Sequence, residues 1–341
     1  VLAPVLEIDD LTVDFALHDG VVNAVRGVSL SVRPGECLGV VGESGSGKST
    51  LAHAVLGLLP KVAHVSSTQF SLAGHDLRAA DQTQLAALRG PAAAMIFQNP
   101  MTAFSPIHTL GRQLTDLLWR DAGQGKDEKR RRIVAALREV GIADPAGKLD
   151  AYPFQFSGGM LQRVAIAAAL LMKPSLLIAD EPTTALDVTM EAQILHLMRV
   201  LKDASGVAIL IISHHLGVIA EICDRVAVMY AGRIVEEGPV ETIFRNPRHP
   251  YPQALFACEP ALIPPGVKRL PVISGEVPRP GSAGCDFASR CGVVEQRCLA
   301  GAPPRQATAP DPPPQSRCPR SAPRKQPPRG KKHPSVRARF P

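Results

Sequence analysis

A glycine-rich segment near residue 45 constrains the fold of this chain more than any other feature. Gly42–Thr50 reads GESGSGKST, which matches the pattern G-x-x-x-x-G-K-[ST], and it directly follows the largely apolar run 36–41. That pattern holds phosphate groups when a strand leads into the loop and a helix leaves it, because the loop amides and the helix N-terminus then face one anion. We therefore predict a strand over 36–41, a helix over 48–59 and a phosphate site between them.

The residue types in this loop each have a chemical reason. Glycines let the backbone wrap closely around phosphates, so that successive N–H groups point inward. Lys48 is predicted to reach the β- and γ-phosphates, and the Ser49 hydroxyl to bind Mg²⁺. The competing interpretation is a turn with an accidental lysine, which chance produces in roughly one chain in a hundred of this length. The predicted nucleotide-binding residues of the loop are Gly42, Ser44, Gly45, Gly47, Lys48, Ser49 and Thr50.

The first 240 residues alternate short apolar runs with helical patterns, which favours an α/β fold with a largely parallel sheet. Strands of such a sheet are nearly continuous in apolar residues, since both faces are covered. The predicted strands after the loop are 92–97, 175–180, 207–213 and 224–230, the last followed by a turn at Gly232. The predicted helices after the loop are 107–119, 127–140, 157–172 and 188–204.

Two further segments point to phosphate chemistry. The apolar strand 176–180 ends in Asp180 and is followed by Glu181. Carboxylates at the carboxyl end of a parallel strand face the same crevice as the phosphate loop, so Asp180 is predicted to hold Mg²⁺ and Glu181 to polarise the attacking water. The Ser-Gly-Gly segment 157–159 opens a predicted helix and forms a second candidate anion site. Taken alone, the acidic strand end can also be a helix cap, and a Ser-Gly-Gly helix start is most often only a cap and turn.

In combination, these segments resemble the ATP-binding subunits of ATP-binding-cassette (ABC) transporters over about residues 5 to 260. Six motifs of that family occur here in the family's order. They are Walker A (Gly42–Thr50), the Q-loop (Gln98), the signature motif (Ser157–Met160), Walker B (Leu176–Asp180, then Glu181), the D-loop (Ala185–Asp187) and the switch histidine (His214). The resemblance implies an ABC-type P-loop ATPase core with a helical subdomain.

The resemblance also implies roles for residues outside the loop. Gln98, Glu181 and His214 are expected to act in ATP hydrolysis. Phe15 lies where the family has an aromatic residue that stacks on adenine, although a core phenylalanine explains it almost as well. Two subunits are expected to meet head to tail, so that the signature motif of one caps the ATP held by the other. The implied Mg²⁺ contacts are Ser49, Gln98 and Asp180, and the implied nucleotide contacts across the dimer are Ser157, Gly158, Gly159 and Asp187.

Two features indicate which branch of this family the chain resembles. Met160 stands where many members have Gln, and the segment 238–251 contains a His-Pro-Tyr run. Both resemble the oligopeptide/dipeptide (and nickel) importers, whereas Leu161, where that branch has Arg, departs from the pattern. The resemblance implies an ATPase that powers import of di- or oligopeptides at the cytoplasmic face of the cell membrane. Its implied partners are a second ATPase subunit, two transmembrane permease subunits that dock on the segment 101–156, and an extracytoplasmic substrate-binding protein.

Four of the seven cysteines lie near the C-terminal end with the spacing C-x₅-C-x₆-C-x₁₉-C. They are Cys285, Cys291, Cys298 and Cys318. In a cytosolic protein such a group favours a metal over disulfides, and the lack of C-x₂-C pairs disfavours zinc. The segment resembles the C-terminal module of peptide-importer ATPases, some of which hold a [4Fe–4S] cluster on four thiolates. We therefore expect a [4Fe–4S] cluster, with zinc and unligated or disulfide-bonded cysteines as the alternatives.

Charge and composition divide the chain. It has 38 Lys and Arg against 31 Asp and Glu, yet eight of the basic residues and no acidic one fall in 319–341. The rest is close to neutral, which disfavours nucleic-acid binding. The proline-rich tail is expected to be disordered and solvated, with contact to anionic lipids as the alternative. The predicted divisions are an ATPase domain over 1–245 with a helical subdomain at about 101–172, a C-terminal module over 246–320 and a basic tail over 321–341.

Other functions stay open at this point. No stretch approaches the ~20 apolar residues that span a bilayer, so membrane association must come through a partner. The cargo could equally be nickel, glutathione or an opine-like solute, because the ATPase does not touch it. ABC-type ATPases of DNA repair separate Walker A from the signature motif by a long coiled coil, whereas here only 109 residues separate Lys48 from Ser157. Translation factors of this class carry two cassettes in one chain, whereas this chain has one. Both roles are therefore disfavoured. A redox sensor built on the cysteine module is the remaining alternative.

Overall fold

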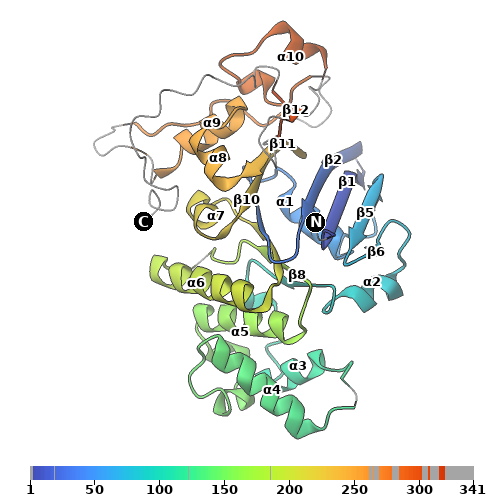
Figure 1. Cartoon of the computed structure of the whole chain (residues 1–341), viewed down its shortest axis with the longest axis vertical. Coiled ribbons are helices and arrows are strands. Elements are labelled where there is room, and N and C mark those ends of the chain that lie inside the picture. Colours follow the sequence, from blue (N-terminus) through green and yellow to red (C-terminus); the bar gives the residue numbers. More distant parts are fainter. Residues whose placement is uncertain are drawn as a thin grey trace.

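The computed structural model describes residues 3–18, 20–121, 123–184, 186–260, 263, 269–278, 284–301, 306–307 and 315–318. The tail 321–341, predicted to be disordered, lies outside these residues. Strands occupy the centre of the molecule, helices α3, α4 and α5 lie at one end, and α8, α9 and α10 lie at the other (Figure 1). Within the described residues, no helix has the length and apolar character needed to cross a membrane.

The central sheet has the strand order β12-β13-β11-β10-β3-β9-β8-β7. Its strands are β3 (Cys37–Val41), β7 (Ala93–Ile96), β8 (Leu176–Asp180), β9 (Ala208–Ile212), β10 (Arg225–Tyr230), β11 (Arg233–Pro239), β12 (Gln306–Ala307) and β13 (Gln315–Ser316). The strands from β10 to β7 are parallel, as the apolar runs predicted, and β11 returns antiparallel after the turn at Gly232. The carboxyl ends of β3 and β8 therefore lie at one edge of the sheet, and both lead into predicted site residues.

Both faces of the parallel strands are buried, which explains their unbroken apolar sequence. In β3, Leu38 and Val40 belong to one apolar cluster, whereas Cys37 and Val41 belong to another. Side chains of a strand alternate between the two faces of a sheet, so each strand contributes to both clusters. These two cores hold the edge that carries the site rigidly in place.

A second, antiparallel sheet precedes and flanks the first. Its strands are β1 (Leu6–Leu17), β2 (Gly20–Val32), β4 (Ala63–Ser66), β5 (Gln69–Leu72) and β6 (His75–Asp76). The order is β2-β1-β5-β6, and β4 pairs with β1. The sequence analysis did not predict this sheet. Register shifts in β1 between Ile8 and Asp14 interrupt the two-residue alternation that would have revealed it.

The described residues include the five helices predicted above, with shifted ends, together with further short helices. They are α1 (Lys48–Val55), α2 (Gln82–Leu88), α3 (Leu110–Leu117), α4 (Lys126–Glu139), α5 (Gly158–Leu171), α6 (Val188–Ser205), α7 (Leu216–Ile222), α8 (Val240–Arg245), α9 (Pro250–Ala257) and α10 (Gln296–Ala300), with 3₁₀ helices at Pro100–Thr102, Gly147–Asp150, Pro153–Gln155 and Ala288–Arg290. α1 stops before residue 59 because Gly57 adopts a φ of 60°, a left-handed conformation that ends helices. α3 starts after residue 107 because the Gln113 side chain accepts from the Ser105 N–H and donates to the His108 carbonyl, which holds 105–108 as a loop.

The C-terminal elements pack onto the two sheets through aromatic and charged contacts. Rings of Tyr230 from β10, Tyr251 from α9 and Phe287 lie with centroids 4.5 to 5.5 Å apart. Beside them, Arg26 of β2 donates to the Asp286 carboxylate at 2.7 Å, and both side chains are nearly excluded from solvent. The contact between Arg26 and Asp286 joins residues 260 positions apart.

His249 provides a test of this packing by pH. The ring is buried, its Nδ1 accepts from the Tyr251 N–H, and burial lowers its pKa to about 3. An unfolded chain protonates this ring near pH 6.5, so native stability attributable to His249 is lost as the pH falls from 6.5 to 3, by up to about 1.4 kcal/mol per pH unit. The neighbouring carboxyl of Glu236, whose pKa burial raises to about 7, acts in the opposite direction between pH 7 and 4.5.

The measurement compares urea unfolding of the full chain with that of His249→Asn at pH 7, 5.5 and 4. Asparagine also caps a helix but does not titrate, and the contribution of Glu236 cancels between the two proteins. As the pH falls, we expect the free energy of unfolding of the wild type to decrease relative to that of His249→Asn. A difference that does not change with pH would contradict a buried neutral His249.

Candidate nucleotide-binding site

The predicted phosphate loop connects β3 to α1, and two of its positions admit only glycine. Gly42 and Gly47 have φ angles of 155° and 100°. A Cβ at Gly42 would lie 2.1 Å from the Met229 carbonyl oxygen, and a Cβ at Gly47 would lie 2.3 Å from the Ala24 carbonyl oxygen. The loop therefore rests directly on the backbone of β10 and β2. A Cβ at Gly45 would meet nothing within 4 Å, so the loop is open at this position.

Lys48 lies inside this loop. Its Nζ donates to the carbonyl oxygens of Gly42 at 2.8 Å and Glu43 at 2.9 Å. Burial lowers the pKa of the ammonium group below its ordinary value, opposed by the nearby carboxylates of Glu181 and Asp180. A buried ammonium group inside the phosphate loop is well suited to bind the phosphates of a nucleotide.

Two of the three residues predicted to contact Mg²⁺, Ser49 and Asp180, meet at the end of β8, whereas Gln98 donates to Glu181. The Ser49 hydroxyl donates to the Asp180 carboxylate at 3.1 Å. Asp180 is buried, and burial raises the pKa of its carboxyl above the usual range. Hydroxyl and carboxylate oxygens are ligands that Mg²⁺ prefers, usually together with substrate phosphates and water. The donor set therefore fits a Mg²⁺ ion that accompanies a nucleotide.

Two of the three predicted catalytic side chains, Gln98 and His214, contact the carboxylate of the third, Glu181. Glu181 Oε1 lies 3.0 Å from His214 Nδ1, and Glu181 Oε2 accepts from Gln98 Nε2 at 2.9 Å. Thr184 Oγ1 also donates to Oε2, at 3.0 Å, a contact that the sequence analysis missed. Glu181 adopts a φ of 48°, unusual for a residue with a side chain and typical of functional sites. Three elements thus fix one base candidate beside the Mg²⁺ ligands.

The signature and D-loop residues act as helix caps in the single chain. Ser157 Oγ accepts from the Met160 N–H at the start of α5, and Asp187 accepts from the Met190 N–H at the start of α6. Both cap residues are exposed. Among the described residues, no hydrogen bond joins either of them, or Gly158 and Gly159, to the phosphate loop. Their contact with ATP across a dimer stays a prediction.

Phe15 lies on β1, opposite Val22 of β2 and Ala63 of β4. It is partly buried and packs against the apolar cluster of the antiparallel sheet. Packing of this kind accounts for a phenylalanine without a ligand. Its stacking on adenine also stays a prediction.

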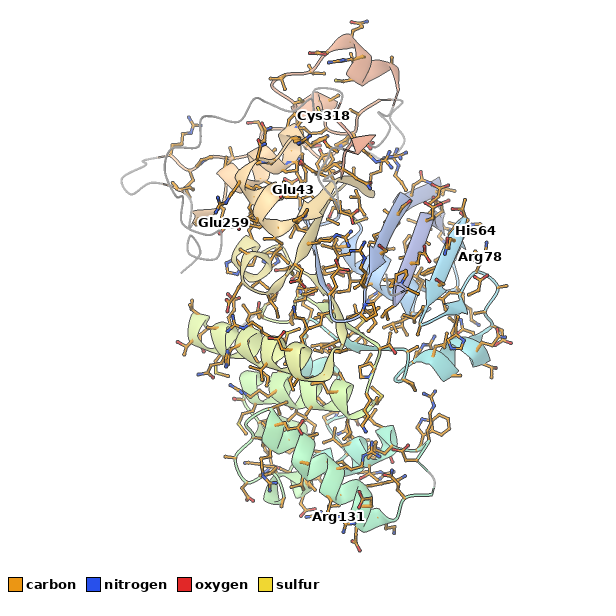
Figure 2. All side chains as sticks on the ribbon, in the orientation of Figure 1. Glu43, His64, Arg78, Arg131, Glu259 and Cys318 are labelled. Atoms are coloured by element: carbon orange, nitrogen blue, oxygen red, sulfur yellow. The ribbon has the colours of Figure 1, made fainter. Side chains whose placement is uncertain are left out.

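Two residues beyond 245 contact the phosphate loop at Glu43, which the sequence analysis did not anticipate. Glu43 is labelled in Figure 2, beside the C-terminal elements. Tyr251, in the His-Pro-Tyr run, accepts a hydrogen bond from the Glu43 N–H at 2.9 Å. Arg290 donates to both carboxylate oxygens of Glu43, at 2.7 and 3.0 Å. The resemblance singled out the His-Pro-Tyr run as typical of the peptide importers, but nothing in the sequence around Arg290 points to this loop.

The four C-terminal cysteines do not form the predicted iron–sulfur ligand set. Across the part of the chain that the structure describes, no three His, Cys, Asp or Glu side chains come together as a metal-binding group. The Cys285 N–H donates to the Cys298 carbonyl, and the Cys285 thiol lies 3.9 Å from the buried His249 ring. The prediction of a [4Fe–4S] cluster is therefore not supported.

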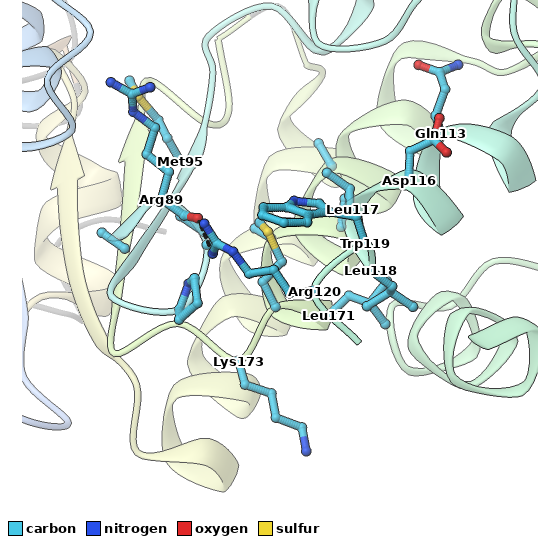
Figure 3. Close-up of a pocket in the computed structure, with 18 of the residues that line it drawn as sticks. Arg89, Met95, Gln113, Asp116, Leu117, Leu118, Trp119, Arg120, Leu171 and Lys173 are labelled. Carbon is cyan, nitrogen blue, oxygen red and sulfur yellow. Dashed lines mark hydrogen bonds between the residues drawn. The ribbon is translucent and has the colours of Figure 1, made fainter. Parts of the chain in front are cut away.

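A groove of about 1040 Å³ lies between the central sheet and the α3–α5 helices (Figure 3). Phe97, which precedes Gln98, and Trp119 both line this groove. The Trp119 side chain is 68% exposed, and Arg120 is fixed beside it by a hydrogen bond to the Arg89 carbonyl. An exposed tryptophan over an apolar groove is typical of a protein interface.

Comparison with known proteins agrees with this geometry. Residues 25–184 match the family described as "ABC transporter", and residues 235–298 match "Oligopeptide/dipeptide transporter, C-terminal region". The chain is 47% identical over 289 residues to a probable peptide ABC transporter ATP-binding protein from Sinorhizobium fredii, covering 84% of this chain and 86% of that protein. It is 44% identical over 290 residues to the dipeptide transport ATP-binding protein DppD from Bacillus subtilis, with the same shares covered.

Solved structures show the same fold. The dimeric ATP-binding cassette MJ0796 bound to ADP and phosphate matches 69% of this chain and 98% of its own, with a TM-score of 0.62 and 24% identity. The cbiO1 cassette from Clostridium perfringens matches 71% of this chain and 91% of its own, with a TM-score of 0.60 and 27% identity. The predicted ABC-type ATPase core is thus confirmed, and the chain belongs to the family of peptide ABC transporter ATP-binding proteins.

Proposed function

We propose that this chain hydrolyses ATP to power the import of di- or oligopeptides through a membrane permease. The observation that carries the ATPase part is the Glu181 carboxylate, held by Gln98 and His214 next to the Ser49–Asp180 pair. The peptide part is supported by the names of the relatives and by the C-terminal region that the chain shares with oligopeptide transporters.

The side chains have separate tasks in the proposed reaction. The phosphate loop and Lys48 bind the phosphates, and Ser49 and Asp180 hold Mg²⁺, which neutralises charge on the transferred phosphoryl group. Glu181 accepts a proton from the attacking water, with Gln98 and His214 fixing its carboxylate in place. Since phosphoryl transfer depends on positioning and electrostatics more than on covalent chemistry, a preset carboxylate suits this task.

We further propose that two ATPase subunits enclose the nucleotide head to tail. The exposed caps Ser157 and Asp187 then meet the ATP of the partner subunit, which is identical or homologous. Val188, 81% exposed at the start of α6, would be covered in such a dimer. The dimeric cassette MJ0796 supports this arrangement by analogy of fold.

The groove beside Trp119 is the proposed docking site for a permease segment. It adjoins Phe97 and therefore the Gln98 segment that contacts Glu181. Movement of a docked permease segment would shift Phe97 and Gln98, which follow β7, and would thereby change the contact of Gln98 with Glu181. Through the permease, the chain would associate peripherally with the cytoplasmic face of the membrane, and an extracytoplasmic binding protein would deliver the peptide.

The experiment that tests this function is purification of the tagged full chain from native membranes, followed by mass spectrometry and peptide uptake in reconstituted vesicles. We expect two permease subunits, a second ATPase subunit and ATP-dependent uptake of a dipeptide. Recovery of ribosomes or DNA without membrane proteins would contradict the proposal. Uptake of nickel or glutathione but not of peptides would contradict its cargo alone.

Replacement of Trp119 by glutamate tests the docking site. Loss of a central aromatic contact and burial of a charge are expected to lower the amount of co-purified permease by about tenfold or more. ATP binding should be unchanged, because Trp119 does not contact the nucleotide site. Val21→Glu is the matched control, since Val21 is 64% exposed on β2 of the other sheet. Equal loss of permease in both variants would argue against this groove.

A further inference from the structure

The start of the phosphate loop is held by side chains from far along the sequence. The Glu43 N–H donates to Tyr251 Oη at 2.9 Å, and its carboxylate receives two hydrogen bonds from the Arg290 guanidinium. The Glu43 carbonyl accepts from Lys48 Nζ. The amide, side chain and carbonyl of this one residue thus connect C-terminal residues to the lysine of the phosphate loop.

Arg290 is well placed to hold this residue rigidly. Its side chain is only 4% exposed, whereas that of Glu43 is 27% exposed. Besides Glu43, the guanidinium donates to the carbonyl oxygens of Ser274 and Ile273 and to the Tyr230 hydroxyl. The contact to Glu43 raises the pKa of Arg290 further above its ordinary value. A planar, bidentate pair fixes direction as well as distance, which a lysine could not do.

The charge of Glu43 gives this pair a functional consequence. The carboxylate lies close enough to Lys48 to affect its electrostatics, so it would also repel the phosphates of an incoming nucleotide. Arg290 neutralises that charge and turns the carboxylate away into the C-terminal elements. At the same time it orders the loop before the nucleotide arrives, which lowers the entropy cost of binding.

We propose that Arg290 is a positioning residue of the nucleotide site, through which the C-terminal module sets the shape and charge of the phosphate loop. The proposal rests on the proposed ATPase function and extends it. In this proposal the affinity for ATP depends on the C-terminal module, which lies outside the ATPase core. No sequence motif in that module indicates a role in nucleotide binding.

The test measures equilibrium binding of ATP and steady-state hydrolysis with the full chain. Arg290→Met is expected to raise the Kd and KM for ATP about tenfold, as for loss of a charge-assisted bidentate pair, with kcat changed less than about twofold. Arg290→Lys should recover part of the affinity. Arg297→Met is the matched control, because Arg297 lies in the same module and pairs with Glu295 at an exposed site; it should leave binding unchanged.

Two further readouts separate positioning from a general loss of folding. The double variant Arg290→Met, Glu43→Gln should bind ATP no more weakly than Arg290→Met alone, because the uncompensated carboxylate is gone. Hydrogen exchange of residues 42–48 in the nucleotide-free protein should accelerate in Arg290→Met and also in Glu43→Gln, which leaves the C-terminal module untouched.

The outcomes are distinct. Wild-type affinity in Arg290→Met, losses that multiply in the double variant, or unchanged exchange of 42–48 in Glu43→Gln would overturn the proposal. A wild-type chain that binds no ATP would overturn the proposed function, and this inference with it, before any variant is compared.

Discussion

Replacement of Glu181 by glutamine is expected to lower ATP turnover by at least about 100-fold while leaving ATP binding intact. Glutamine keeps the size of the side chain and its contacts with Gln98 and His214, but it cannot take a proton from water. The loss corresponds to about 2.7 kcal/mol of activation free energy. Because the nucleotide is no longer consumed, the variant should also accumulate as an ATP-bound dimer.

The measurement is single-turnover hydrolysis, with ATP binding and size-exclusion chromatography of the same samples. Asp76→Asn serves as the control, because Asp76 on β6 pairs with Arg78 at an exposed position of the antiparallel sheet, outside the nucleotide site. It should hydrolyse ATP at the wild-type rate. Undiminished hydrolysis by Glu181→Gln would remove Glu181 from the role of base, and failure to bind ATP would assign it to ground-state binding instead.

The parallel half of the fold and the nucleotide site were predictable because their signals are local. The phosphate loop, the apolar strand before Asp180 and the Ser157 cap each follow from short patterns whose residue types have one physical purpose. The convergence of Gln98 and His214 on Glu181 was not visible in any pattern. It came from the resemblance to a family, since the three lie up to 116 positions apart.

The antiparallel sheet and the C-terminal contacts were not predictable for physical reasons. Bulges disturb the alternation of β1, and cross-strand partners are set by register rather than by composition. The cysteine spacing favoured a metal centre, yet the position of a thiol depends on how its short segment packs. Cys285 lies against the buried His249 ring, and among the described residues it is not part of a metal-binding cluster.

The ion pair between Arg26 and Asp286 shows how much such unpredictable contacts can contribute. Both side chains are almost fully buried, and Arg233 lies 3.4 Å from the second carboxylate oxygen. Asp286→Ala leaves two arginines near one another without their shared counter-charge. Breaking a buried pair from one side is expected to cost about 3–5 kcal/mol of local stability, whereas the exposed pair of Arg297 with Glu295 is worth about 1 kcal/mol or less.

Hydrogen exchange measures this difference where it arises. In Asp286→Ala, amides of 284–301 are expected to exchange more than about 100-fold faster than in the wild type, since 1.4 kcal/mol corresponds to a factor of ten. Glu295→Ala, in the same segment, should change their rates by less than about fivefold. Because the Arg290–Glu43 contact depends on this segment, exchange of 42–48 should rise in Asp286→Ala as well. Wild-type protection of 284–301 in that variant would show that the aromatic contacts of Tyr230 and Tyr251 hold the segment without the ion pair.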